Sequence, residues 1–141
     1  MPSPVNTTRR VLAVFDDRAT ADRGAAAARR AGARIVERLE GGAAADAIDA
    51  TGARRGVVAR IGRAVQFSVE DQMPALAWYE AALREGRIVL AVPTSGREQT
   101  LAVVAALEAA GGHFINRFGR LATEEFLRWR GPEPKLPSVL K

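Results

Sequence analysis

An internal repeat is the sequence feature that most restricts how this chain can fold. Residues 11–39 align with residues 89–118, and both copies begin with the same tetrapeptide, Val-Leu-Ala-Val. In each copy a helix-like stretch follows and ends at Gly32 or Gly111, and a second strand-like stretch comes after it. Each copy is therefore predicted to form a strand, a helix and a second strand.

Two β-α-β units in tandem predict an α+β fold of the ferredoxin-like kind, a four-stranded antiparallel sheet with both helices on one face. The first and third strands, at 11–15 and 88–92, are continuous apolar runs, as expected of central strands that are buried on both faces. The second and fourth strands, at 33–39 and 113–118, interleave polar residues and are predicted at the sheet edges. A flavodoxin-like parallel sheet is the alternative if the segment between the repeats contains a further strand.

The two repeat helices have similar boundary signals. The first is predicted to begin at the acidic pair 16–17 and to stop at Gly32. The second is predicted to begin at Ser95, where Glu98 completes a capping box, and to stop at Gly111. Capping explains the acidic pair better than a phospho-acceptor site does, because both lysines of the chain lie in its C-terminal tail.

The segment between the repeats, residues 41–86, is predicted to be a mainly helical insertion. Valine and isoleucine recur at helical spacing within 57–65, which indicates one amphipathic helix. A second helix is expected at 71–85, with Asp71 as its N-cap and Pro74 in its first turn. Because the repeat helices cover only one face of the sheet, this insertion or a second subunit must cover the other face.

The helix at 71–85 carries apolar residues around most of its circumference. We therefore expect it to be buried, either against the second face of the sheet or at a homodimer interface. The candidate interface residues are Leu76, Trp78, Tyr79 and Leu83.

Residues 1–141 are interpreted as a single domain, which is the usual number for a chain of this length. Its expected parts are a flexible N-terminus at 1–8, the first β-α-β unit at 9–40, the helical insertion at 41–86, the second β-α-β unit at 87–120, and a short helix at 123–130 with an extended tail within 121–141.

Composition narrows the classes of function. The absence of cysteine excludes disulfides, thiolate metal sites and a cysteine nucleophile, and it fits a reducing compartment, so a cytoplasmic protein is expected. No apolar run resembles a signal peptide or a membrane-spanning helix, so we expect neither secretion nor membrane association. The net charge of +5 comes almost entirely from arginines scattered along the sequence, which predicts no specific recognition of nucleic acid.

No catalytic residue, metal site or cofactor is predicted. His113 is the only histidine, and a general base or metal ligand needs partners that the sequence does not show. The one group of interest is Arg34, Arg38, His113 and Arg117, which the repeat places at equivalent positions on the two predicted edge strands. If these residues share an open face, a small anion or an acidic protein partner could bind there. The alternative is that the arginines only protect the strand edges from aggregation.

Two stretches, VLAVFDDRATADRGAAAARRAG at 11–32 and WYEAALREGRIVLAV at 78–92, resemble the family of small bacterial general-stress or heat-induced stress proteins. In that family a tyrosine and an acidic residue on a helix precede a leucine, a glycine and an apolar strand, which matches Tyr79, Glu80 and the residues after them. The chain departs from the family in its less glycine-rich middle and in its long basic C-terminal end. The resemblance implies two β-α-β units around a variable middle, and it transfers no catalytic residues.

We therefore expect a non-enzymatic, stress-associated homodimer that works as an interaction or small binding module. The alternative is an enzyme or a small-molecule-binding protein whose pocket lies between the sheet and the insertion. That pocket would use Tyr79, Glu80, His113 or Arg117.

Overall fold

The computed structural model describes residues 9–48, 68–119 and 123–135. Its elements in chain order are β1 (Arg10–Phe15), α1 (Arg18–Arg30), β2 (Glu37–Glu40), α2 (Gly41–Ile48), α4 (Ser68–Arg84), β3 (Ile88–Pro93), α5 (Arg97–Ala109), β4 (His113–Phe118) and β5 (Thr123–Leu127). The helix predicted at 57–65 and the flexible N-terminus predicted at 1–8 lie outside the described residues.

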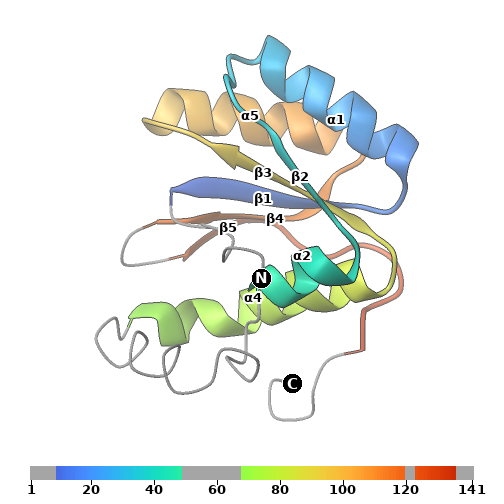
Figure 1. Ribbon diagram of the computed structural model, residues 1–141. Coiled ribbons are helices and arrows are strands. Elements are labelled where there is room, and N and C mark those ends of the chain that lie inside the picture. The colour runs from blue at the N-terminus through green and yellow to red at the C-terminus, as the bar shows by residue number, and fades with distance from the viewer. Residues whose placement is uncertain (1–8, 49–67, 120–122, 136–141) are drawn as a thin grey trace.

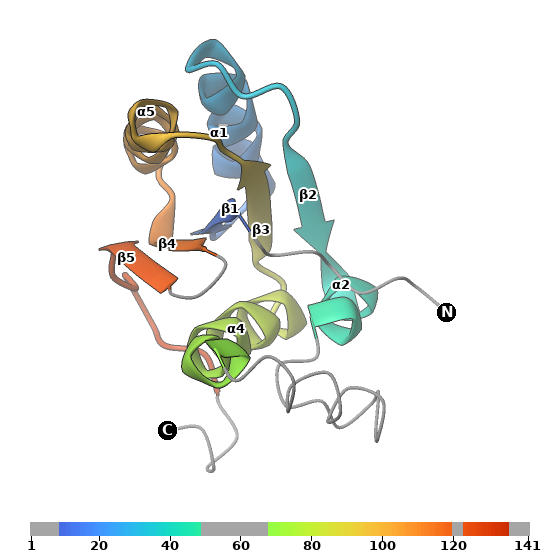
Figure 2. The same cartoon turned by 90° about the vertical axis from the view of Figure 1, so that its left-hand side faces the viewer.

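The strands form one antiparallel sheet in the order β2-β3-β1-β4-β5. Helices α1 and α5 lie on one face of this sheet, and α2 and α4 lie on the other (Figures 1 and 2). The prediction that β1 and β3 are central and β2 is at an edge is confirmed. Because neighbouring strands are antiparallel, the alternative of a parallel sheet is wrong.

The prediction that β4 lies at an edge of the sheet is wrong, because β5 pairs with its outer side. The helix predicted at 123–130 is therefore wrong, and the pairing starts where Thr123 lies opposite Phe118. A helix this short gains little from its own hydrogen bonds, whereas a strand satisfies the open backbone edge of β4. Phe126 and Leu127 of β5 also pack against the hydrophobic core.

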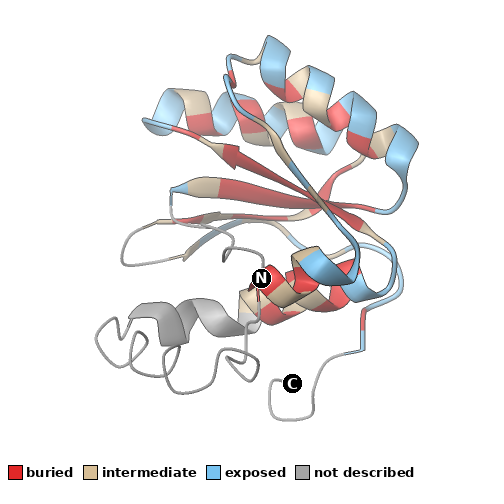
Figure 3. Ribbon diagram, viewed as in Figure 1, coloured by how far each residue is buried: buried red, intermediate tan, exposed pale blue. Residues whose placement is uncertain are grey.

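Both faces of the central strands are buried, as their apolar sequences predict. Val11, Ala13 and Phe15 of β1 belong to the core under α1 and α5, and Leu12 and Val14 belong to the core under α2 and α4. Figure 3 shows the buried residues along the inner sides of both helix layers. The insertion therefore covers the second face of the sheet.

The close packing of α1 on the sheet depends on two glycines around the ring of Phe15. A Cβ atom at Gly24 would lie 2.5 Å from Cζ of Phe15, and one at Gly112 would lie 2.8 Å from the same atom. Neither position leaves room for a side chain, so the glycines allow the buried ring to fill the space between helix and strand.

The beginnings of two helices agree only partly with the prediction. Oδ1 of Asp17 accepts the backbone N–H of Thr20 at 2.8 Å, which confirms Asp17 as the N-cap of α1. This hydrogen bond lowers the pKa of Asp17 below its usual value. Helix α4 begins at Ser68 rather than at Asp71, so Asp71 is not its N-cap and Pro74 lies beyond its first turn.

Helix α5 begins without the predicted capping box. It starts at Arg97 after Gly96, and no side chain caps it. Ser95 instead donates its backbone N–H to Oε1 of Gln99 at 2.8 Å, so Gln99 makes the bond that was expected of Glu98. The first turn of α5 therefore lacks the side-chain acceptor that usually occupies a helix N-terminus.

Candidate functional site

The structure separates the four residues that the repeat places at equivalent positions. Strands β2 and β4 have β3 and β1 between them. Arg38 of β2 pairs with Asp22 of α1 and, at 2.9 Å, with Glu40, while Arg34 is exposed in the loop before β2. His113 and Arg117 lie on β4, so the four residues do not form one site.

His113 is held by two hydrogen bonds in the interior. Its ring is 1% exposed, Nδ1 accepts the backbone N–H of Arg130 at 3.2 Å, and Nε2 lies 2.9 Å from Oδ1 of Asp16. Because Nδ1 accepts, the proton of the neutral ring is on Nε2 and is donated to Asp16. No free lone pair is left on the ring, so this geometry gives His113 a structural role rather than that of a general base.

The carboxylate of Asp16 also binds Arg87, which anchors the segment after β5. Nε of Arg87 lies 3.2 Å from Oδ1 of Asp16, and Nη2 donates to the carbonyl of Pro132 at 3.1 Å. Its guanidinium lies 5.1 Å from the centre of the Trp129 ring. The backbone N–H of Lys135 donates to Glu85 and, with Arg87, lowers the pKa of that carboxyl. The cluster therefore fixes the described C-terminal residues against the fold.

Tyr79 is fully buried and forms hydrogen bonds at an irregularity in the pairing of β1 with β4. The register of this pair shifts near Phe114, whose φ is +46°. The Tyr79 hydroxyl lies 2.9 Å from the carbonyl oxygen of Leu12 and 2.6 Å from that of Phe114, and it accepts a hydrogen bond from Nδ2 of Asn116 at 2.9 Å. Burial raises the pKa of Tyr79, so the hydroxyl keeps its proton as a donor. Its role is to stabilise a β-bulge, and no ligand can reach it.

The remaining predicted residues of α4 lie within the fold or on the helix surface. Leu83 is buried, and Leu76 and Trp78 are half-buried. The Trp78 ring stacks on Phe114 with a centroid distance of 5.3 Å. Glu80 binds Arg84 one turn later at 2.8 Å. The aromatic residues thus contact the chain itself, and the proposal of a homodimer interface here stays a prediction.

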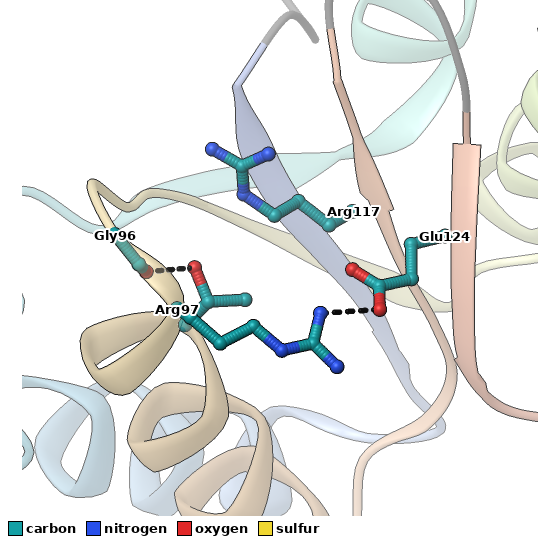
Figure 4. A pocket seen from close by; sticks show the side chains of 5 residues that line it. Gly96, Arg97, Arg117 and Glu124 are labelled. Atoms are coloured by element: carbon teal, nitrogen blue, oxygen red, sulfur yellow. Dashed lines mark hydrogen bonds and ion pairs between the residues drawn. The ribbon is translucent and has the colours of Figure 1, made fainter.

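A cavity of about 220 Å³ lies at the N-terminus of α5, against β4 and β5 (Figure 4). Its lining residues are Gly96, Arg97, Thr100, Arg117 and Glu124. Two of these side chains are guanidinium groups that come from different elements, α5 and β4. The cavity is on the α5 side of the sheet, not between the sheet and the insertion.

Two threonines position Arg117 at this cavity. Nε of Arg117 donates to Oγ1 of Thr94 at 3.1 Å, and Nη2 donates to the carbonyl of Thr94 at 3.3 Å. The Thr100 hydroxyl lies 2.9 Å from Oγ1 of Thr94 and 2.8 Å from the carbonyl of Gly96. Thr94 and Thr100 are buried, so these bonds hold the guanidinium in one orientation.

Arg97 lies on the other side of the cavity and pairs with Glu124 of β5. Its guanidinium is also 5.6 Å from the ring centre of Phe126. The uncapped first turn of α5 adds the partial positive charge of its backbone N–H groups. The cavity therefore combines two cations and a helix N-terminus with one carboxylate, a charge balance that suits an anionic group.

Sequence analysis identified Arg117 but missed the other residues of this cavity. Ser95, next to Thr94, was interpreted as the start of the helix, and Arg97 was one of many scattered arginines. The available signal was the Pro-Thr-Ser-Gly loop at 93–96, which joins a buried strand to a helix whose N-cap position has no side chain.

Within the described ranges, no group of three or more histidine, aspartate or glutamate side chains could hold a metal ion. No helix in the described part of the chain is long and apolar enough to cross a membrane. The sequence matches no family model, and neither curated proteins nor solved structures give a match.

Proposed function

We propose that this protein is a non-enzymatic binding module that holds a small anionic group in the cavity at the N-terminus of α5. The observation that carries this proposal is that Arg97 and Arg117, which come from two different elements, both line one cavity. A phosphate or carboxylate group is the class of ligand that such guanidinium groups bind best, because their planar donors match its oxygens.

Two features support binding rather than catalysis. The Thr100 hydroxyl, the only hydroxyl lining this cavity, is bonded to Thr94 and Gly96, and Glu124, the one carboxylate lining it, is paired with Arg97. His113 has both ring nitrogens engaged on another part of β4. A nucleophile activated by a base, which most hydrolytic mechanisms need, is not formed by these groups.

The wider proposal is a cytoplasmic, stress-associated homodimer with a ferredoxin-like fold. The first four strands support the fold, since their order, β2-β3-β1-β4, is the one that two tandem β-α-β units predict. Strand β5 is then an addition at one edge. The link to stress and the bacterial origin rest on the resemblance of the stretches at 11–32 and 78–92.

Isothermal titration with inorganic phosphate at low salt tests the anion site. Arg117→Gln removes the positioned guanidinium and should weaken phosphate binding about tenfold, since a hydrogen bond to a charged group contributes roughly 1.5 kcal/mol or more. Glu124→Gln removes the competing carboxylate and should strengthen binding. Arg128→Gln, at a side chain that is 92% exposed and outside the cavity, is the matched control and should leave the affinity unchanged.

Two results would reject the proposal. One is an absence of phosphate binding by the wild-type protein up to tens of millimolar. The other is equal affinity in Arg117→Gln and Arg128→Gln, which would show that only overall charge matters.

A further inference from the structure

Arginines that are far apart in the sequence come together at the end of the molecule where α5 begins. Strand β1 starts at this end, because Arg10 lies opposite the last residues of β3 and β4. Helix α1 finishes at the same end, because Nε2 of Gln99 donates to the carbonyl of Gly32 at 3.1 Å. In Figure 1, α5 and β1 begin on the left, and α1 ends above them near the top. The fold thus brings the residues around 9, 29–34, 97 and 117 to one end.

Four of these arginines have no partner charge within the described part of the chain. Arg9, Arg29, Arg30 and Arg34 are exposed, and no carboxylate pairs with them among the residues that the structure describes. We call these four arginines the cationic end.

At the opposite end of the molecule several arginines pair with carboxylates, while Arg130 is exposed and donates to the backbone carbonyls of Gly111 and Gly112. Arg87 pairs there with Asp16 at 3.2 Å and with Glu85 at 2.9 Å, and Arg18 pairs with Glu40 at 3.2 Å. Most of the exposed arginines that no carboxylate pairs with among the described residues therefore lie at the end where α5 begins. The field of such a group attracts extended polyanions.

We infer that the cationic end docks the phosphodiester backbone of nucleic acid without preference for sequence. Unpaired guanidinium groups bind phosphate oxygens and release the counterions of the nucleic acid, and this interaction carries no sequence information. The arginines of the cationic end lie outside the cavity, so the inference does not depend on the anion site. It is also consistent with the expectation that specific recognition is absent.

Anionic lipid is the competing partner for such a surface. A protein that lies on a bilayer also needs a continuous exposed apolar face. Among the described residues the exposed large hydrophobic side chains are Ile35, in the loop before β2, and Leu101 of α5. The observations therefore favour nucleic acid.

Fluorescence anisotropy with a labelled 20-nucleotide single strand, between 50 and 200 mM salt, tests the inference. Arg29→Gln with Arg30→Gln should weaken binding about fivefold per arginine, as expected for loss of a charge pair in water. The slope of log K against log salt should fall by roughly 1.4, since each phosphate contact contributes about 0.7 for a single strand. The control, Arg23→Gln with Arg128→Gln, makes the same change in net charge at exposed positions outside the cationic end and should change the affinity less than about twofold.

If the Arg29 and Arg30 variant does not fold, Arg9→Gln with Arg34→Gln tests the same surface outside the helices and should show the same loss. Equal effects of the test and control variants would overturn the inference, as would absence of binding at 50 mM salt. Tighter binding to anionic vesicles than to the 20-mer at equal salt would assign the surface to lipid instead. A several-hundred-fold preference for one sequence would overturn its sequence independence.

The same variants separate this inference from the anion site. Phosphate titration of the Arg29 and Arg30 variant should give the wild-type affinity. Arg117→Gln should weaken phosphate binding about tenfold while most of its affinity for the 20-mer remains. If phosphate binding fails in the wild type and the 20-mer still binds through the cationic end, the proposed anion site is wrong and this inference stands.

Discussion

Replacing Tyr79 by phenylalanine removes one oxygen from the interior of the protein. That oxygen lies within hydrogen-bond distance of the carbonyl oxygens of Leu12 and Phe114 and of Nδ2 of Asn116. Tyr79→Phe leaves the Asn116 donor and at least one carbonyl without this partner in a buried place. Each buried polar group that loses its partner costs about 1 to 3 kcal/mol, so for two groups we expect a loss of roughly 2 to 6 kcal/mol in the free energy of unfolding.

Tyr79→Ala adds a cavity to this loss. Truncation of a buried aromatic residue costs about 3 to 5 kcal/mol before the unpaired polar groups are counted. Since domains are stable by only about 5 to 15 kcal/mol, this variant should be close to unfolded. The structure therefore predicts that even the conservative change to phenylalanine lowers the free energy of unfolding. The loss is larger than expected if Tyr79 were only one of the apolar contacts of α4.

Urea unfolding followed by tryptophan fluorescence measures these changes, because Trp78 and Trp129 lie 5.4 Å apart in the fold. Thr123→Val is a suitable control, since Oγ1 of Thr123 is buried and has no hydrogen-bond partner in the part of the chain that the structure describes. This control should be neutral or slightly stabilising. A Tyr79→Phe variant within about 0.5 kcal/mol of wild type would refute the role assigned to the hydroxyl.

Three further predictions concern packing, pH and assembly. Gly24→Ala should destabilise the protein by about 1 to 3 kcal/mol, because its Cβ would meet Phe15. Gly42→Ala, in a helix with open space around it, should stabilise the protein by about 0.5 to 1 kcal/mol. Equal thermal shifts for the two variants would contradict the packing argument. Because the pKa of Tyr79 is raised in the folded state, its contribution is complete below the ordinary tyrosine pKa of about 10 and is lost as pH rises above it. Wild type should therefore lose stability at alkaline pH more steeply than Tyr79→Phe, and parallel pH profiles would exclude this cause. Trp78→Ala should lower the free energy of unfolding by about 2 kcal/mol or more. If α4 forms the proposed homodimer interface, the variant should also show a lower mass in sedimentation. An unchanged dimer would place the interface elsewhere.

The strands could be predicted because a short stretch of sequence shows whether a strand is buried on one face or on both. The runs at 11–15 and 88–92 have no polar residue, and only a strand with both faces covered can bury all of them. The duplication then gave the order of β2, β3, β1 and β4. Glycine after each repeat helix marked its end correctly, because Gly32 and Gly111 both have positive φ.

The errors arose where contacts between distant segments decide the local structure. Residues 123–127 form a strand only because β4 offers an open edge, and the buried ring of His113 binds Asp16, 97 positions earlier in the chain. A pattern read along one segment contains no information about such partners. The same limit explains why Ser95 and Asp71 were assigned as caps that the structure does not show.

By itself, the sequence determined the two β-α-β units, their central strands and the need for a second covering layer, because hydrophobic periodicity and turn residues act locally. Only the tertiary structure decided what lies together at the ends of the sheet. The packing of α1 beside α5 brings Arg29 and Arg30 near the end that holds Arg97 and Arg117, and Thr94 binds the guanidinium of Arg117, which lines the cavity. Charges that are remote in sequence become neighbours because the sheet order and the direction of each helix, not spacing along the chain, set their distances.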